Sequence, residues 1–428
     1  MIRPLIRTVV AAMLLTMGGS CADGVGGGGS SDSLDAGSHG DAALLDASYV
    51  DGGDTDAGPC GPGSDGDFTL LGEISADTWR TVTVPACSQA EQFVVAAGGQ
   101  TLRLEVRGLA GPVQVTVVDA HGAEVAAALV TDAQGSVDFT ADTTVEHRVR
   151  LARADVATST AYDARLVCLD QCDLEATRYP IVLVHGAGGA DAFGLLDYFY
   201  EVEATLEGYG YLSHAPSVTA MAHSETRALD LAAAIDVILA DTGAGKVHLV
   251  GHSQAGLDFR VLLGGMGYGD RVATATSLST PHAGYRPGLS VGSTWFGMRT
   301  DAEYLTGEFA ALFPEDPAVP RFSWAAATCA YYDLACLARY DDEVVAAALA
   351  ATYQTVRTAY LDDPFGGDND GLVPVSAAQW GTFLGVLPAD HWDLVGQIPA
   401  QRLGFFDHLD HYLDEARRLR AAEVDLGL

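Results

Sequence analysis

Two patterns of hydrophobic and polar residues follow one another along the chain. Between residues 68 and 172, apolar and polar residues alternate in short runs such as TLRLEVRG and VQVTVVDA, with Gly, Asp and Ala-Gly turns between them. A period of two predicts strands with one buried face, so we expect a small antiparallel β-sandwich. The runs cover residues 68–74, 79–84, 92–97, 101–108, 113–120, 136–141, 147–154 and 162–169.

From Tyr179 onward the apolar runs become continuous, as in PIVLVHGAGG, KVHLVGHS and RVATATSLSTPH. Such runs are typical of buried parallel strands, and the segment ALDLAAAIDVILADTG between two of them has a helical period. Residues 173–428 are therefore expected to form an α/β domain with a parallel sheet. Ligands of such sheets bind at the carboxyl ends of the strands.

The N-terminus has the features of an export signal. Residues 1–20 carry Arg3 and Arg7, an apolar run over 9–17 and small residues before Cys21. The run is too short to span a bilayer, which favours a signal peptide. Cys21 then resembles the lipid-modified cysteine of bacterial lipoproteins; the alternative is an ordinary signal peptide with Cys21 removed or unpaired. We predict a membrane-anchored exported protein without a transmembrane helix.

Residues 21–67 predict a flexible tether, because the stretch after Cys21 holds ten Asp, no Lys or Arg, and many Gly and Ser. Such a segment cannot bury enough apolar surface to offset its conformational entropy. The formal net charge of the whole chain is -34, with 23 Lys+Arg against 57 Asp+Glu. A nucleic-acid partner is therefore not expected, since phosphate binding needs a basic surface.

Seven cysteines are present, and six remain if Cys21 is the lipid anchor. An even number in an exported chain favours disulfides, although the pairing stays open from sequence. Cys329 and Cys336 are distant from the others and are expected to pair locally. The other four, Cys60, Cys87, Cys168 and Cys172, bracket the predicted sandwich.

The sequence Gly251-His252-Ser253-Gln254-Ala255-Gly256 follows a predicted strand and precedes a predicted helix. This is the context of a nucleophile elbow, in which a sharp turn exposes a serine hydroxyl. The usual G-x-S-x-G pattern has Ala255 at its fifth position here, with Gly256 one residue later. The alternative is an ordinary Gly-rich turn.

Five blocks in order resemble the true bacterial lipases of the Pseudomonas and Burkholderia type: PIVLVHGAGG, KVHLVGHSQAG, ATSLSTPHAG, NDGLVPVS and HWDLVGQ. They lie within residues 178–400. The resemblance implies a secreted α/β-hydrolase that acts on triacylglycerols, so the expected fold is an α/β-hydrolase domain preceded by the antiparallel β-sandwich. It also implies an acyl-ester substrate and no organic cofactor. Relatives can need a folding chaperone, and we expect a monomer.

The resemblance assigns a Ser-His-Asp triad to Ser253, His391 and Asp370, in the chain order of this fold. Asp368 is the rival acid. His408 is the rival base, but it lies in a segment with the apolar spacing of an amphipathic helix, where we place His408 and His411 on the polar side. The oxyanion donors would be the main-chain N–H groups of Ala187 and Gln254.

The family also carries a structural calcium ion and a lid. The spacing after His391 offers Asp393 and Gln397 as calcium ligands, with a carbonyl near Gln401. The resemblance places a second calcium-binding aspartate at Asp341, with Asp342 and Asp333 as alternatives. Asp341 could instead cap the helix that follows it. The lid would lie within residues 283–322. When it opens, it would expose an apolar patch with contributions from Trp295, Phe296, Leu305, Phe309 and Phe313. The alternative is a buried helical insertion.

These patterns predict a carboxylic-ester hydrolase acting through an acyl-enzyme, and a triacylglycerol lipase for medium to long acyl esters in particular. A polyester depolymerase and a short-chain esterase are alternatives, because the length of the acyl pocket is not visible in the sequence. A different class is a non-catalytic surface binding protein in which the sandwich binds the partner. The sandwich resembles pre-peptidase-type modules of secreted hydrolases and could be a spacer or a binding module.

Overall fold

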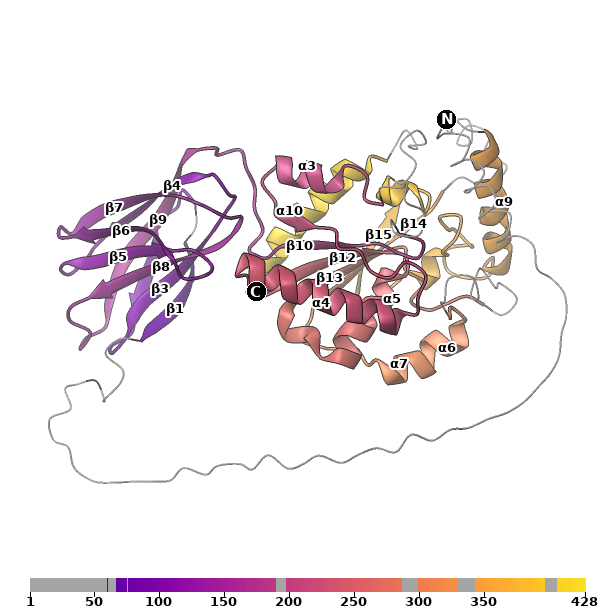
Figure 1. Cartoon of the computed structure of the whole chain (residues 1–428), viewed down its shortest axis with the longest axis horizontal. Coiled ribbons are helices and arrows are strands. Elements are labelled where there is room, and N and C mark those ends of the chain that lie inside the picture. The colour runs from indigo at the N-terminus through magenta and orange to yellow at the C-terminus, as the bar shows by residue number, and fades with distance from the viewer. Residues whose placement is uncertain are drawn as a thin grey trace, which may run out of the picture.

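The computed structural model describes Cys60 and residues 67–74, 76–189, 198–286, 299–328, 343–396 and 406–428. A sandwich domain, ending near residue 172, lies beside an α/β domain that contains the rest of the described chain (Figure 1). Cys21, the tether apart from Cys60 and Asp67, Cys329 and Cys336 lie outside the described residues, so the predictions made for them stay predictions. None of the helices in the described ranges is long and apolar enough to cross a bilayer.

The sandwich domain consists of two sheets that enclose one apolar core. Leu104, Val115 and Val149 are fully buried between the sheets, as the alternating pattern requires. One sheet has the order β1 (Phe68–Glu73), β3 (Gln89–Ala96), β8 (Val145–Arg153), β5 (Val113–Val118) and β6 (Glu124–Val130). The other has the order β2 (Arg80–Val84), β9 (Thr160–Asp170), β4 (Thr101–Arg107) and β7 (Gln134–Thr140).

Two details of the sandwich differ from the sequence-based expectation. β1 pairs with β3 in parallel, whereas the expected sandwich was antiparallel throughout. The chain passes through β2 in the facing sheet between them, and a strand that returns by such a crossover runs in its original direction. β6 was not predicted, because its sequence EVAAALV is rich in alanine, which strands disfavour.

Two disulfides connect the four cysteines around the sandwich. Cys60 pairs with Cys87, and Cys168 pairs with Cys172, with Cα–Cα distances of 5.3 and 5.7 Å. The structure thus selects one pairing among those that the sequence left open. Disulfides form in oxidising compartments, which agrees with an extracytoplasmic location.

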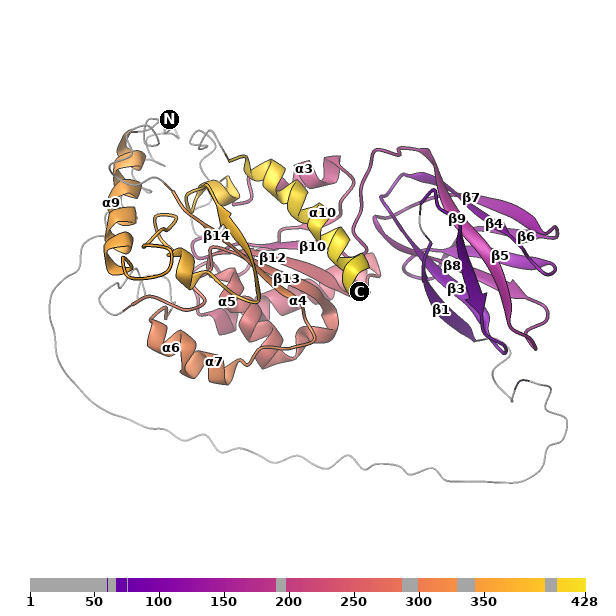
Figure 2. The same ribbon diagram turned by 180° about the vertical axis from the view of Figure 1, so that it is seen from behind.

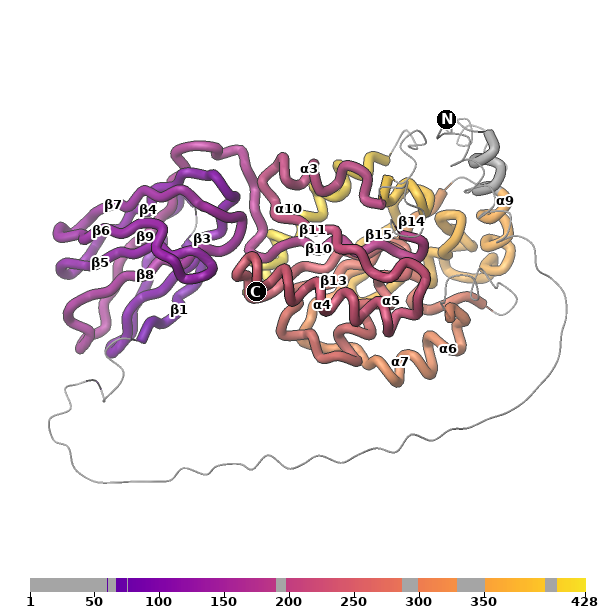
Figure 3. The backbone as a smooth tube through the Cα atoms, viewed as in Figure 1, coloured from indigo at the N-terminus to yellow at the C-terminus, as the bar shows by residue number. Residues whose placement is uncertain are grey.

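The α/β domain is built on a parallel sheet of six strands in the order β11-β10-β12-β13-β14-β15, with β11 at the edge beside β10 (Figure 3). The strands are β10 (Ile181–Val184), β11 (Ser213–His214), β12 (Val247–His252), β13 (Val272–Leu278), β14 (Arg321–Ala326) and β15 (Thr382–Leu387). The helices are α3 (Val202–Gly208), α4 (Ser224–Thr242), α5 (Ala255–Arg260), α6 (Ala302–Thr306), α7 (Glu308–Leu312), α9 (Glu343–Ala359) and α10 (His408–Leu426).

Helices cover both faces of this sheet (Figures 1 and 2). Val182 packs in a cluster with residues of α4 and α5, whereas its neighbour Leu183 packs in a cluster with residues of α3 and α10. Both faces of the central strands are therefore buried, which explains why these strands are apolar without alternation.

The C-terminal helix was predicted, but the placement of its histidines on a polar side was wrong. His408 is 1% exposed, and its Nε2 lies 2.9 Å from the carbonyl oxygen of Tyr200. His411 packs against the rings of Trp324 and Phe406. Because α10 contacts the sheet and the loops above it, a wider arc of the helix is buried than its aliphatic residues indicate.

The two domains are joined by charged side chains. Glu73 at the end of β1 pairs with Arg420 of α10, and Arg178 of the connecting segment pairs with Glu146 of β8 at 2.6 Å. The guanidinium of Arg178 also lies 3.9 Å from the ring centroid of Phe93. This contact covers Phe93, and Arg148 and Arg150 pair with Glu91, so the outer face of β3 is largely buried as well.

Candidate active site

Ser253 lies in a strained turn between β12 and α5. Its φ is +59°, in the left-handed region that residues with a side chain rarely adopt. The turn brings strand and helix so close that a Cβ on Gly251 would lie 2.4 Å from the Phe259 ring, and one on Gly256 2.4 Å from the Thr280 hydroxyl. Gly256, one residue later than in the usual pattern, is thus the position that needs glycine, and Ala255 is accommodated.

The turn is held against the end of β13. The N–H of Ser253 donates to the carbonyl oxygen of Leu278 at 2.9 Å, and the Thr280 hydroxyl donates to the carbonyl oxygen of Ser253 at 2.5 Å. Contacts outside the turn therefore maintain the strained φ of Ser253. Strain of this kind persists where the surroundings fix the backbone.

Asp370 and His391 form a buried hydrogen-bonded pair. His391 Nδ1 lies 2.7 Å from Asp370 Oδ2, and the other carboxylate oxygen accepts the N–H groups of Leu372 and Val373 at 2.9 and 2.6 Å. A carboxylate accepts, so Nδ1 carries the proton and Nε2 is left as the basic nitrogen. The rival Asp368 instead lies 3.6 Å from Arg357, and its side chain is 52% exposed.

The structure brings this pair next to the serine turn. The ring of His252, which directly precedes Ser253, lies 4.4 Å from the ring of His391 between centroids. The described residues include no hydrogen bond between Ser253 Oγ and His391 Nε2. Such contacts are often long without substrate and shorten when it binds.

The loop after β10 lies against the serine on its other side. A Cβ on Gly186 would be 2.7 Å from the Cβ of Ser253, so Gly186 and Ala187 lie beside the nucleophile position. Among the described hydrogen bonds, the main-chain N–H groups of Ala187 and Gln254 have no protein acceptor. They are therefore available to an oxyanion, and this role stays a prediction.

Arg227 and Asp258 form a fully buried ion pair behind this loop, which the sequence reasoning missed. Arg227 Nε donates to Asp258 Oδ2 at 2.8 Å, and its Nη groups donate to the carbonyl oxygens of Thr219 and His185. Burial raises the pKa of Asp258 to about 6, although the charge of Arg227 lowers it. The sequence contains a signal for this pair, because each of the two charged residues interrupts an otherwise apolar helix face.

Tyr198 connects the loop and the turn. Its hydroxyl lies 2.7 Å from His252 Nδ1, and a Cβ on Gly186 would be 2.6 Å from the same oxygen. Burial, followed by the nearby His391, lowers the pKa of His252 well below its usual value. His252 is therefore a neutral neighbour of the candidate base rather than a competing cation.

Of the predicted calcium ligands, Asp393 lies within the described residues. Asp393 is 8% exposed, beside Asp390, whose carboxylate accepts the N–H of Asp393 at 2.8 Å. Gln397, Gln401, Asp341, Asp342 and Asp333 lie outside the described residues. Over the part of the chain that the structure describes, no three acidic, His or Cys side chains gather around a common point. Calcium therefore stays a prediction.

The predicted lid segment, residues 283–322, is described by the structure over 283–286 and 299–322. Leu305 of α6 and Phe309 of α7 are 1% and 2% exposed and pack in the same cluster as Leu257 and Leu262. In this conformation these two residues form part of the core, as the alternative of a buried helical insertion proposed. Trp295 and Phe296 lie outside the described residues.

Comparison with known proteins agrees with the fold of the α/β domain. The family model of the alpha/beta hydrolase fold matches residues 179–318. The chain has an α/β-hydrolase domain.

Partial similarity to bacterial triacylglycerol lipases accompanies this fold. The chain is 38% identical over 113 residues to a triacylglycerol lipase of Pseudarthrobacter phenanthrenivorans, covering 26% of this chain and 35% of that one. For a triacylglycerol lipase of Vibrio cholerae the identity is 40% over 116 residues, covering 27% and 36%. For one of Burkholderia plantarii it is 38% over 113 residues, covering 26% and 31%. The match thus spans about a third of the length of these relatives.

Solved structures show more distant similarity. A metagenomic carboxyl esterase aligns with a TM-score of 0.43 and 20% identity, over 59% of this chain and 77% of that chain. A Bacillus licheniformis lipase in its mature form aligns with a TM-score of 0.39 and 21% identity, over 52% and 88%.

Proposed function

We propose that the protein is a carboxylic-ester hydrolase that works through Ser253, His391 and Asp370. The observation that carries the proposal is their convergence at the carboxyl edge of the sheet. Ser253 occupies a strained turn, and a buried His391–Asp370 pair with a proton on Nδ1 lies beside it. The partial similarity to triacylglycerol lipases supports the same chemistry.

Each step of the reaction has a group in this arrangement. Ser253 Oγ attacks the ester carbonyl carbon while His391 Nε2 takes the hydroxyl proton, and Asp370 stabilises the resulting imidazolium. The carbonyl oxygen becomes an oxyanion between the N–H groups of Ala187 and Gln254. The alcohol leaves with the proton from His391. Water, activated by the same nitrogen, then releases the acid and regenerates the serine.

For the substrate, we propose acylglycerols with medium to long acyl chains. The similarity to lipases supports this choice over a short-chain esterase or a polyester depolymerase. Hydrolysis of p-nitrophenyl esters from C2 to C16 and of emulsified triacylglycerol tests it. We expect a maximum at C8 or longer and activity on the emulsion; a maximum at C2 with no activity on the emulsion would refute the lipase assignment.

The rival class, a non-catalytic binding protein on the same fold, predicts no covalent reaction at Ser253. We expect a fluorophosphonate probe to label the wild type and not the Ser253→Ala variant. The Ser279→Ala variant is a matched control, because Ser279 also lies at a strand end with a positive φ of 46° and is buried. Equal labelling of the wild type and Ser253→Ala would refute the mechanism.

We also propose that Cys21 carries a lipid that anchors the chain to a membrane outside the cytoplasm. The export signal supports this, and the two disulfides agree with the compartment. The full-length protein should partition into the detergent phase of Triton X-114, and the Cys21→Ser variant into the aqueous phase. Equal partitioning of the two proteins would refute the proposed lipid anchor at Cys21.

A further inference from the structure

Asp370 fixes one edge of the His391 ring. Its carboxylate holds Nδ1 at 2.7 Å, and the main-chain N–H of His391 donates to the carbonyl oxygen of Asp370 at 3.0 Å. Nε2, the atom that would exchange a proton with Ser253, is not part of that edge. The place of Nε2 therefore also depends on the tilt of the ring about its bonded edge.

The ring of His252 supplies a contact that limits this tilt. His252 is fully buried, and the centroid of its ring lies 4.4 Å from that of His391 at an interplanar angle of 48°. Among the described rings that contact His391, the other is Trp392, which is 6.0 Å away between centroids. Because His391 is itself buried in close-packed surroundings, a change in its tilt requires the ring of His252 to move.

Tyr198 in turn holds the ring of His252. Its hydroxyl lies 2.7 Å from His252 Nδ1, and both side chains are buried. The tyrosine reaches this place because position 186 is glycine, where a Cβ would lie 2.6 Å from the hydroxyl oxygen. A hydrogen bond at Nδ1 favours one orientation of the imidazole, so the orientation of His252 is set by Tyr198.

We propose that His252 and Tyr198 are positioning residues for His391. The Tyr198 hydroxyl orients the imidazole of His252, and that imidazole sets the tilt at which His391 Nε2 faces Ser253. Neither of the two exchanges a proton in the reaction. The proposal rests on the proposed function, since that function makes His391 the base.

Substitutions at the two positions, alone and together, test this role in the full-length protein. Tyr198→Phe and His252→Phe each remove the hydrogen bond and keep an aromatic ring in place. Each should lower kcat by about 10- to 100-fold with KM within about twofold, because a small displacement of a catalytic group is costly. Since Tyr198 acts through His252, the double variant should lie within about threefold of His252→Phe, whereas independent effects would multiply.

The leaving group gives a readout that a loss of stability does not change. A 4-nitrophenolate leaves as a stable anion, whereas an alkoxide needs the proton that His391 Nε2 holds. A displaced Nε2 should therefore lower kcat/KM for ethyl butyrate more than for p-nitrophenyl butyrate. We expect the ratio of the two values to change by about fivefold or more in both single variants.

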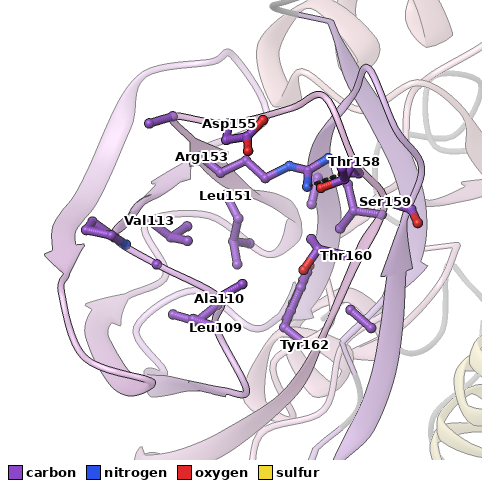
Figure 4. A pocket seen from close by; sticks show the side chains of 16 residues that line it. Leu109, Ala110, Val113, Leu151, Arg153, Asp155, Thr158, Ser159, Thr160 and Tyr162 are labelled. Atoms are coloured by element: carbon purple, nitrogen blue, oxygen red, sulfur yellow. Dashed lines mark hydrogen bonds between the residues drawn. The ribbon is translucent and has the colours of Figure 1, made fainter. Parts of the chain in front are cut away.

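Tyr162→Phe is the matched control. Tyr162 is another buried tyrosine, whose hydroxyl donates to Gln92 Oε1 at 2.8 Å, and it lines a pocket in the sandwich (Figure 4). The substitution breaks a buried hydrogen bond in the domain that carries none of the candidate catalytic residues. It should lower the melting temperature about as much as Tyr198→Phe does, and leave both kcat and the leaving-group ratio unchanged.

Melting curves establish that each variant is folded before its kinetics are measured. If His252→Phe does not fold, His252→Leu takes its place, and Tyr198→Phe should again add little to it. A kcat of Tyr198→Phe within about twofold of the wild type, an unchanged leaving-group ratio, or effects that multiply in the double variant would overturn the positioning role.

Two further measurements separate this role from the proposed function. If the wild type hydrolyses neither ester, or if Ser253→Ala retains the hydrolysis, the proposed function fails and the positioning role fails with it. If hydrolysis depends on Ser253 but not on Tyr198, the proposed function stands and the positioning role alone is refuted.

Discussion

The buried ion pair of Arg227 and Asp258, behind the loop after β10, should make stability depend on pH in a direction opposite to that of a surface ion pair. Burial raises the pKa of Asp258 to about 6 from 3.8. Between these values the folded protein keeps a proton on Asp258 that the unfolded chain has released. The folded state is therefore favoured at low pH, and this contribution is lost as the pH rises through about 6.

The size of the effect follows from the shift of about two pKa units. Each unit corresponds to about 1.4 kcal/mol, so the complete effect is about 3 kcal/mol, and ionisation of Asp258 should lower the free energy of unfolding by about 2.4 kcal/mol between pH 4 and pH 7. The Asp258→Asn variant cannot ionise here. Its free energy of unfolding, relative to that of the wild type, should rise by about 2.4 kcal/mol over this range, whatever constant offset the uncompensated charge of Arg227 adds.

Urea unfolding at half-unit pH steps, followed by tryptophan fluorescence, measures this difference. Asp236→Asn is the control, because Asp236 lies on the neighbouring α4 and pairs with Arg271 at the surface, with a side chain 47% exposed. Its difference from the wild type should vary by less than about 1 kcal/mol. A flat difference for Asp258→Asn, or one that falls as the pH rises, would refute the reasoning.

Further substitutions and additions test other parts of the site. Asp370→Asn should lower kcat by about three to four orders of magnitude with little change in KM, since the amide no longer fixes the proton on His391 Nδ1; a loss below tenfold would contradict the proposed role. Gly256→Ala should lower the free energy of unfolding by about 1–3 kcal/mol in thermal or urea melts, because its Cβ would meet Thr280 at 2.4 Å. Gly267→Ala is its control for a solvent-facing glycine, with nothing within 4 Å of the added Cβ, although its positive φ adds a smaller cost. EDTA should lower the melting temperature or activity of the wild type and have no effect on the Asp393→Ala variant. If EDTA leaves the wild type unchanged, the calcium prediction is refuted.

Most of the fold could be predicted from the sequence because its strands have clear periods. The continuous apolar runs of β10, β12 and β13 follow from burial on both faces. β6 could not be predicted, since an alanine-rich strand owes its conformation to its neighbours rather than to its own residues. The parallel pairing of β1 depends on which sheet β2 joins, and a local pattern does not contain that information.

The candidate site was predictable where a motif fixes geometry and not where long-range contacts fix it. The turn at Ser253 follows from its small neighbours within a few residues. The ion pair of Arg227 with Asp258 spans 31 residues, and the buried place of His408 depends on the carbonyl of Tyr200, 208 residues away. Sequence periodicity predicts that a helix is amphipathic, but it does not show how far neighbouring loops cover the helix.

The contact between Glu73 and Arg420 has a consequence for how the protein can be attached to a surface. Arg420 also donates a hydrogen bond to Glu423, and the carboxylate of Glu423 lies 2.8 Å from His248 Nε2, near the start of β12. Ser253 follows the other end of the same strand. A strand of six residues is about 20 Å long. A support coupled ahead of β1 would therefore hold the molecule by the end of the sheet remote from the serine, and the substrate would approach from the free side.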